Sequence, residues 1–207
     1  MKKIYLHPLP VRIWHWINAI AFIILIITGL QMRIPDKWHF MSVETAIDIH
    51  SIFGFILIAN YFIWFVYYFF TGKVFKIYIP PFWRPVKWIS SMLAQAKYYA
   101  YGIMVGEKNP HHPTPENKFN PLQQVFYCFI MLIALPLQLI TGLILWDPLS
   151  FSKLASIFGG LQIVSFIHTA LWMFFVFFIF VHIYLSTLGK TPFAHIKAMF
   201  TGYEEED

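Results

Sequence analysis

Four long runs of apolar residues alternate with shorter polar segments along the chain. The runs cover about residues 14–32, 46–70, 122–146 and 163–188, and each is flanked by polar or helix-breaking residues. A helix needs about 20 apolar residues to cross the hydrocarbon core of a bilayer, and each run is long enough. The pattern predicts an all-α membrane protein, in which residues 1–207 form a single domain built on a bundle of four transmembrane helices.

The composition and the charge pattern agree with this class. Hydrophobic residues make up 58% of the 207 residues and charged residues only 12%, which is typical of a polytopic membrane protein. Of the 15 Lys and Arg residues, twelve lie in the two terminal tails and the second connection, and three lie in the other connections. The positive-inside rule therefore predicts that both termini are cytoplasmic. The net charge of +5 then reflects topology and not nucleic-acid binding.

The connection between the second and third runs, residues 71–121, is long for a compact bundle. Apolar residues recur in it at helical spacing and predict a helix in the headgroup layer, formed around Trp88, Ile89, Met92, Leu93, Ala96 and Tyr99. The proline-rich segment 110–115 ends this region. A second short helix is predicted in the tail, with Thr191 as N-cap, Pro192 in the first position and Phe200 near the end.

The single cysteine limits the redox chemistry that the chain can hold. One cysteine forms no intramolecular disulfide, no Cys-x-x-Cys-His attachment for c-type haem and no ligand set for an iron–sulfur cluster. Because Cys128 lies inside the third run, we interpret it as a small buried hydrophobic residue. Any redox centre is therefore held without cysteine.

Four of the nine histidines lie within the apolar runs, at positions 15, 50, 168 and 182. An ionisable side chain is costly in a bilayer, so such residues usually face the bundle interior and have a function. His168 and His182 are 14 residues apart, which gives a rise of about 21 Å and nearly the same helix face. In the predicted orientation, His15 and His182 lie at the cytoplasmic depth and His50 and His168 at the outer depth.

Two pairs of histidines at matched depths indicate haem binding, because each pair can clamp one macrocycle between facing helices. A lone histidine of this kind is more typical of a hydrogen bond across helices. A proton-coupled transporter would bring carboxylates into its spans, whereas Asp48 stands only at a helix start. An oxygenase-type metal site would place histidines three or four residues apart, and no run contains such a pair. His111 and His112 are interpreted as solvated loop residues.

Small residues near these histidines leave two interpretations open. Gly54 lies one turn after a histidine, and Gly29 and Gly142 lie in the first and third runs. They favour either close approach to a porphyrin or ordinary helix packing. The segments Ile-Ile-Thr-Gly-Leu (26–30) and Leu-Ile-Thr-Gly-Leu (139–143) are either a faint repeat or a coincidence.

Two arginines on the predicted cytoplasmic side offer a further contact. Arg12 precedes the first run and Arg84 lies in the long connection. Either guanidinium can pair with the propionates of a haem at the cytoplasmic depth. The alternative is that both serve only as topology charges.

Several motifs around the histidines resemble a known family. The first run opens with Arg-Ile-Trp-His-Trp-Ile-Asn (12–18), and the last run contains Ile-His (167–168) and Val-His-Ile-Tyr (181–184). These motifs, together with the 14-residue histidine spacing, resemble the cytochrome b superfamily. It contains gamma subunits of membrane-bound formate dehydrogenases, b-type cytochromes of Ni-Fe hydrogenases and thiosulfate reductase cytochrome b subunits. The ending at residues 192–203 is most similar to the thiosulfate reductase and hydrogenase branches.

The resemblance implies a di-haem b membrane anchor that exchanges electrons between a quinone pool and a peripheral redox subunit. It implies that His15 and His182 ligate the cytoplasmic haem, and that His50 and His168 ligate the outer haem. This assignment agrees with the pairing by depth.

The same resemblance implies a quinone, either menaquinone or ubiquinone, near the cytoplasmic haem. In formate dehydrogenase gamma subunits, a Lys-Phe-Asn segment before the third span contributes to this pocket. Residues 118–120 read Lys-Phe-Asn here, so Asn120 is the quinone candidate. Asn120 also precedes Pro121, and an asparagine before a proline is equally typical of a helix start.

The implied partners are an iron–sulfur subunit or a multihaem cytochrome c, together with a catalytic subunit, and the implied location is the bacterial or archaeal cytoplasmic membrane. The chain is then an electron-transfer subunit and not a complete enzyme. Two alternatives stay open. A stand-alone di-haem cytochrome that acts on a small molecule predicts activity of the purified chain alone. A non-redox membrane anchor or metal carrier predicts no haem absorption.

Overall fold

The computed structural model describes residues 3–114, 117–189 and 191–205. Within them, four helices are long and apolar enough to cross a membrane. They are α1 (Leu9–Arg33), α2 (Val43–Phe70), the continuous segment Pro121–Trp146 and α8 (Leu161–Ser186). The predicted four-helix class is confirmed, and the predicted boundaries differ from the observed ones by five residues at most.

The largest of these differences is at the start of α1, which begins at Leu9 and not near Trp14. Pro10 lies in the first turn of the helix, where its missing N–H costs no hydrogen bond and its fixed φ favours the helix. α2 begins at Val43, three residues before the predicted start: Ser42 is the N-cap, and its hydroxyl accepts a hydrogen bond from the Thr45 N–H at 3.0 Å.

The third span contains a change of helix type. It consists of α5 (Pro121–Phe129), the π-helical segment η2 (Ile130–Ala134) and α6 (Leu135–Trp146). In η2 the Leu135 N–H donates to the Ile130 carbonyl, five residues back. Pro136 follows directly, and proline disturbs the hydrogen bonding of the preceding turn because it has no N–H. The π turn confines the disturbance of the helical hydrogen bonding near Pro136 to the segment Ile130–Ala134.

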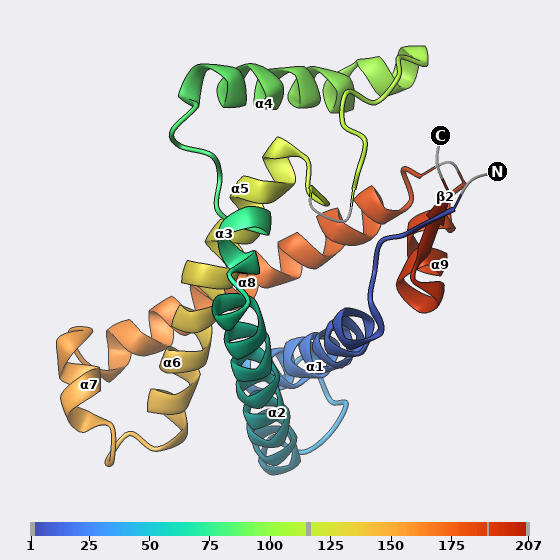
Figure 1. Cartoon of the computed structure of the whole chain (residues 1–207). Helices are drawn as coiled ribbons and strands as arrows, with labels where there is room; N and C mark the ends of the chain where they lie inside the picture. The colour runs from blue at the N-terminus through green and yellow to red at the C-terminus, as the bar shows by residue number, and fades with distance from the viewer. Residues whose placement is uncertain (1–2, 115–116, 190, 206–207) are drawn as a thin grey trace.

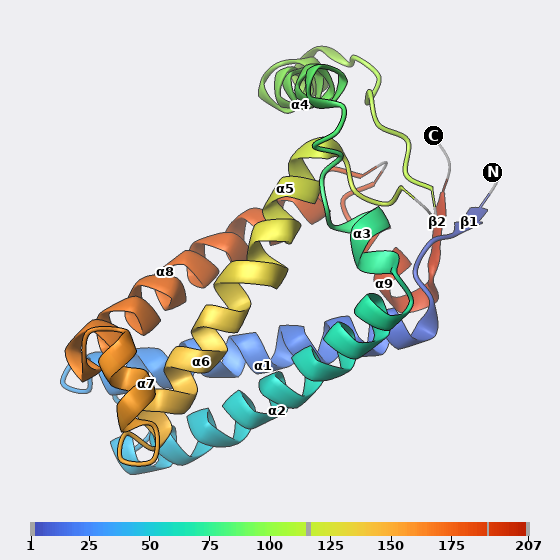
Figure 2. The same cartoon turned by 60° about the vertical axis from the view of Figure 1, so that its left-hand side comes forward.

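The four spans form two packed pairs. α1 packs along α2, and α6 packs along α8, as Figures 1 and 2 show. Asn60 and Trp14 join α1 to α2 in both directions: the Trp14 indole N–H donates to the Asn60 carbonyl at 3.1 Å, and the Asn60 amide donates to the Trp14 carbonyl at 3.0 Å. A buried cluster connects the two pairs and includes Ala21, Leu57, Trp64, Tyr68, Met131, Leu135 and Phe175.

The bundle has two distinguishable ends. One end carries the strands β1 (Lys3–Tyr5) and β2 (Tyr203–Glu205), and the other carries the short helix α7 (Ser152–Ile157), as Figure 2 shows. We call them the terminal end and the far end. The terminal end also carries α3 (Lys73–Ile77), α4 (Pro85–Ala100), the 3-10 turn η1 (Gly102–Val105) and α9 (Ala194–Thr201).

The two predicted short helices are present. α4 corresponds to the helix predicted in the long connection and lies outside the bundle, beyond the start of α5 (Figure 2). The tail helix α9 begins at Ala194, so the prediction of Thr191 as its N-cap was wrong. Residues 191–194 instead form a turn that precedes the helix, closed by the Ala194 N–H on the Thr191 carbonyl at 2.9 Å.

The antiparallel ribbon of β1 and β2 was not predicted. It pairs Ile4 with Glu204 and Tyr5 with Tyr203, and the two tyrosine rings pack with centroids 5.1 Å apart. Gly202 ends α9 at φ 88°, a backbone conformation that favours glycine. Its carbonyl accepts hydrogen bonds from two consecutive N–H groups after β1, at 2.9 and 3.1 Å.

Two side chains make the ribbon sensitive to pH. Burial, followed by the charges of Lys118, His195 and Arg12, lowers the pKa of His7 to about 4, against the opposing effect of Glu204. Burial raises the pKa of Glu204, but the hydrogen bond from His195, at 3.0 Å, and the charges of His195 and His7 leave that pKa lowered. The folded ribbon therefore disfavours protonation of both groups.

We expect the ribbon to lose stability as the pH falls from about 6.5, the pKa of an unfolded histidine, towards 4. Hydrogen exchange of residues 3–7, corrected for the intrinsic pH dependence, should become faster across this range. α6 contains no titratable residue and is the internal control. His7→Gln should remove the upper part of the effect. Equal protection of the ribbon at pH 7 and pH 4.5 would contradict the prediction.

Candidate functional site

One transmembrane helix, α8, supplies a histidine at each of two depths. The ring of His182, towards the terminal end, faces His15 of α1 with ring centroids 6.1 Å apart. The ring of His168, towards the far end, faces His50 of α2 at 6.4 Å. We call these the terminal-end pair and the far-end pair. The structure therefore brings together the two pairs predicted from helix depth.

The spacing within each pair fits a shared metal. Because a metal–imidazole bond is about 2.0 Å long and the ring nitrogen lies about 1.2 Å from the ring centre, two imidazoles on opposite sides of one metal have centres about 6.4 Å apart. Both observed separations are close to this value. Among the described residues, no three His, Cys, Asp or Glu side chains gather to hold a metal ion. Two imidazoles suit an iron whose remaining ligands come from a porphyrin.

The far-end pair is held by polar side chains of α1 and α6. The Thr28 hydroxyl lies 2.8 Å from His50 Nδ1, and the Thr141 hydroxyl lies 3.0 Å from His168 Nδ1. The Gln138 amide nitrogen lies 3.2 Å from His168 Nε2, while its oxygen is buried and has no partner.

The terminal-end pair has fewer polar partners. His15 Nδ1 is buried and has no hydrogen-bond partner among the residues that the structure describes. The Tyr127 hydroxyl lies 3.5 Å from His182 Nδ1, at the limit of a hydrogen bond. The ring of Phe178 stacks on His182 with centroids 5.6 Å apart. The His15 ring is therefore positioned mainly by packing.

The three glycines noted in the sequence differ in their surroundings. A Cβ added to Gly54 would meet no atom within 4 Å, so there is open space beside α2 one turn after His50. A Cβ on Gly142 would lie 3.1 Å from the ring of His168, and one on Gly29 would lie 3.1 Å from the indole of Trp172. Gly142 and Gly29 allow helices to approach the far-end pair closely, whereas the Cβ position of Gly54 is open.

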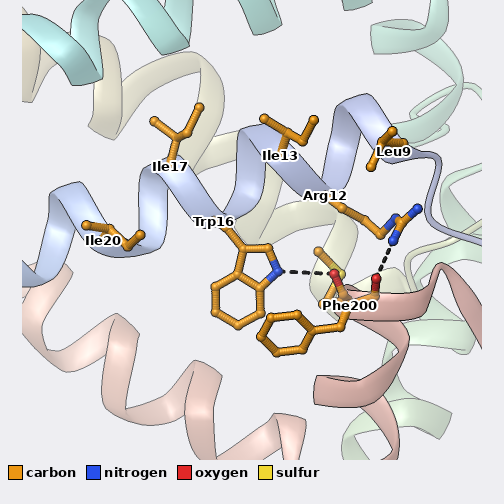
Figure 3. Close-up of a pocket in the computed structure, with 8 residues that line it drawn as sticks. Leu9, Arg12, Ile13, Trp16, Ile17, Ile20 and Phe200 are labelled. Atoms are coloured by element: carbon orange, nitrogen blue, oxygen red, sulfur yellow. Dashed lines mark hydrogen bonds between the residues drawn. The ribbon is translucent and has the colours of Figure 1, made fainter.

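Arg12 takes part in docking the tail helix. Figure 3 shows its guanidinium donating a hydrogen bond to the Phe200 carbonyl of α9. The Trp16 indole donates to the Met199 carbonyl at 3.1 Å and stacks on the Phe200 ring at 4.4 Å. These residues line an apolar groove of about 310 Å³ between α1 and α9. The Arg12 Nε atom is buried without a partner among the described residues. A contact between Arg12 and a haem propionate stays a prediction.

Asn120 is the N-cap of α5. Its side-chain oxygen accepts from the Gln123 N–H at 2.9 Å, and the Gln123 side chain returns the bond to the Asn120 N–H at 3.1 Å. Its amide donates to the Tyr99 hydroxyl at 3.0 Å and so joins α5 to α4. The helix-start interpretation is confirmed, and the quinone role stays a prediction.

Arg84 lies at the start of α4, outside the bundle. It lines a cavity of about 450 Å³ between α4 and the segment that leads into α5. Its proposed contact with a haem propionate is untested.

The polar residues that orient the far-end pair were not predicted from the sequence. Thr28, Thr141 and Gln138 lie inside apolar runs, and polar residues in such runs are seldom without a role. The echo of Thr-Gly in the first and third runs was the available signal. Its significance depends on which histidine each threonine meets, and only the packing of the helices shows this.

Four membrane-length helices and two facing histidine pairs define a class, that of membrane cytochromes b. Residues 6–202 match the family described as prokaryotic cytochrome b561, and the chain belongs to this family. Membership implies haem b as cofactor and confirms the resemblance to the b-type cytochromes of Ni-Fe hydrogenases.

Three relatives show the range of the family. The chain is 36% identical to the protein named cytochrome YdhU of Escherichia coli K12, over 98% of this chain and 75% of that protein. It is 29% identical to a protein named as a Ni/Fe-hydrogenase B-type cytochrome subunit of Rhizobium leguminosarum bv. viciae, over 89% and 81%. It is 25% identical to one named as protein-methionine-sulfoxide reductase subunit YedZ1 of Azospira oryzae, over 95% and 98%.

We expect Gly54→Leu to reduce the haem content of the far-end pair, because the leucine would occupy the open space beside His50. The free space around the Cβ position should let the chain fold normally. The haem-to-protein ratio of the purified protein measures the effect. Ile56→Phe adds bulk on an exposed part of the same helix and should leave the ratio unchanged. Full haem content in Gly54→Leu would show that this space is not used by the cofactor.

Proposed function

We propose that this protein is a di-haem b membrane-anchor subunit of a respiratory oxidoreductase complex. It passes electrons between a peripheral redox subunit and the membrane quinone pool. The observation that carries the proposal is the pairing of each α8 histidine with a histidine of α1 or α2 at a separation that suits one shared iron. His15 and His182 hold one haem b, and His50 and His168 hold the other.

The two pairs lie at different depths of the same bundle, because His168 and His182 are four turns apart on one helix. Haem iron with two imidazole ligands supplies one-electron transfer. The chain's residues hold the two ligands of each pair on different helices, and at the far-end pair Gly29 and Gly142 keep the backbone close to the rings.

The orientation of the bundle belongs to the proposal. Of the 13 Lys and Arg residues that the structure describes, ten lie on segments at the terminal end, which favours a cytoplasmic position for this end in a bacterial or archaeal cytoplasmic membrane. The pair His15 and His182 is then the cytoplasmic-side site.

A quinone site is proposed near the terminal-end pair, with Asn120 as a contact. The support is the position of residues 118–120 in the fold. The ring of Phe119 packs on Tyr127 with centroids 4.6 Å apart, and the Tyr127 hydroxyl reaches towards His182. The Lys-Phe-Asn segment is therefore one aromatic layer away from a proposed haem ligand. Arg12 and Arg84 are the proposed propionate contacts at the same end.

The proposed partners are an iron–sulfur subunit or a multihaem cytochrome c, together with a catalytic subunit. Relatives named as subunits of a Ni/Fe-hydrogenase and of a methionine sulfoxide reductase support a catalytic redox partner. A stand-alone di-haem cytochrome is the second candidate. It predicts that the purified chain alone turns over a small donor or acceptor, whereas an anchor subunit needs its partner.

The haem assignment predicts pairwise losses. Wild-type protein should contain two b-type haems per chain by pyridine haemochrome. His15→Ala and His182→Ala should each lose the same haem, because both remove a ligand of one iron, and His50→Ala and His168→Ala should lose the other. Electron paramagnetic resonance of the remaining haem identifies which one is left. His39→Ala, at an exposed position, is the control. Loss of the same haem in His15→Ala and His50→Ala would refute the pairing.

A matched pair of variants separates the two roles of Asn120. Asn120→Ser keeps an oxygen that caps α5, whereas Asn120→Ala removes it and should destabilise the protein by about 1 kcal/mol. If Asn120 also binds quinone, both variants should weaken quinone binding, measured with a reduced quinol analogue. If it is only a cap, Asn120→Ser should bind the quinol analogue like the wild type, and its stability should fall only by the lost hydrogen bond to Tyr99.

A further inference from the structure

The two Thr-Gly segments of the sequence meet the two histidines of the far-end pair. Thr28 of α1 contacts His50 Nδ1, and Thr141 of α6 contacts His168 Nδ1. Both threonines are buried, with 1% and 0% of their surface exposed. The following glycine lies against the same site in each case: an added Cβ on Gly29 would be 3.6 Å from the His50 ring, and one on Gly142 would be 3.1 Å from the His168 ring. The echo in the sequence is therefore a repeated arrangement in space.

The hydrogen bonds of Thr28 determine which nitrogen of His50 carries a hydrogen. A hydroxyl has one hydrogen to donate. Thr28 donates it to the Ile24 carbonyl, at 2.8 Å, within its own helix. Towards His50 the same oxygen can only accept, so the His50 Nδ1 atom carries a hydrogen and donates it at 2.8 Å. Nε2 of the neutral ring then carries none and keeps its lone pair.

The same reasoning holds for Thr141. Its hydroxyl donates to the Leu137 carbonyl at 2.7 Å and accepts from His168 Nδ1 at 3.0 Å. The Gln138 amide nitrogen lies 3.2 Å from His168 Nε2, a contact that fits the same tautomer. An iron bound at Nε2 would displace this amide.

We propose that Thr28 and Thr141 are positioning residues that hold both far-end imidazoles in the tautomer with hydrogen on Nδ1, so that each presents Nε2 to one shared iron. The proposal rests on the proposed function, which assigns these histidines as haem ligands. A hydrogen bond to the non-ligating nitrogen sets the orientation of an imidazole ligand and raises its basicity. The two threonines act on the histidines and not on the iron itself.

This arrangement distinguishes the two histidine pairs. In the described part of the chain, His15 Nδ1 has no partner, and His182 Nδ1 has only the Tyr127 hydroxyl at 3.5 Å. The far-end imidazoles are therefore the more basic and the more rigidly oriented ligands. A more basic ligand stabilises the oxidised iron. The contribution of the imidazoles therefore gives the far-end haem a lower midpoint potential than the terminal-end haem.

The test compares Thr28→Val and Thr141→Val with the matched Thr28→Ser and Thr141→Ser in the full-length, haem-loaded protein. Valine has nearly the shape of threonine but no hydroxyl, and serine restores the hydroxyl. Haem retention against an excess of apomyoglobin should weaken about tenfold or more for the far-end haem in each valine variant. The midpoint potential of that haem should rise, and the serine variants should recover both values. The terminal-end haem should be unaffected.

Two results would overturn the proposal. One is unchanged retention and potential in the valine variants. The other is serine variants that behave like the valine variants, which would mean that packing and not the hydrogen bond matters.

Nitrogen-15 spectra of histidine-labelled apoprotein read the tautomer directly and should show hydrogen on Nδ1 of His50 and His168 in the wild type. If His50→Ala and His168→Ala retain both haems, the ligand assignment itself fails. If they lose one and the valine variants do not change, only the role of the threonines fails.

Discussion

No water is available in the hydrocarbon core of a bilayer, so polar groups carried into this bundle must find their partners within the protein. Across α1 and α2, the side chains of Asn60 and Trp14 each donate a hydrogen bond to the backbone carbonyl of the other residue. Thr28 and Thr141 bind their own helix backbones and a histidine at the same time. The packing of the helices and the orientation of the far-end imidazoles both follow from this requirement.

Among the described residues, three of the buried polar atoms without a partner belong to the histidine pairs or lie near them. His15 Nδ1, Gln138 Oε1 and the Trp172 indole nitrogen are all buried and unpaired. A buried polar group without a partner costs about 1–3 kcal/mol, so it usually marks a place where something else binds. Together with the open space beside Gly54, these atoms agree with the haem b that family membership implies, and they add to the contrast between the two sites.

The long apolar runs made the four spans predictable, because a bilayer requires about 20 consecutive apolar residues. The 14-residue spacing on the last span, together with the positions of His15 and His50 in their own spans, predicted the histidine pairs, since a helix converts spacing into depth and direction. Other features depended on contacts between distant segments. The ribbon of β1 and β2 joins opposite ends of the chain, and the start of α9 follows from a local turn that displaced the expected cap at Thr191.

The sequence by itself therefore determined the class of this protein, the number of its spans and the depths of its four intramembrane histidines, because length, hydropathy and helical period are properties of one segment at a time. The tertiary structure decided which side chain lies at each imidazole nitrogen, which polar atoms of the described residues stay unpaired, and that Asn120 caps α5 while it binds Tyr99. Each of these depends on an atom from another helix, and the direction of a hydrogen bond is settled only when both of its partners are in place.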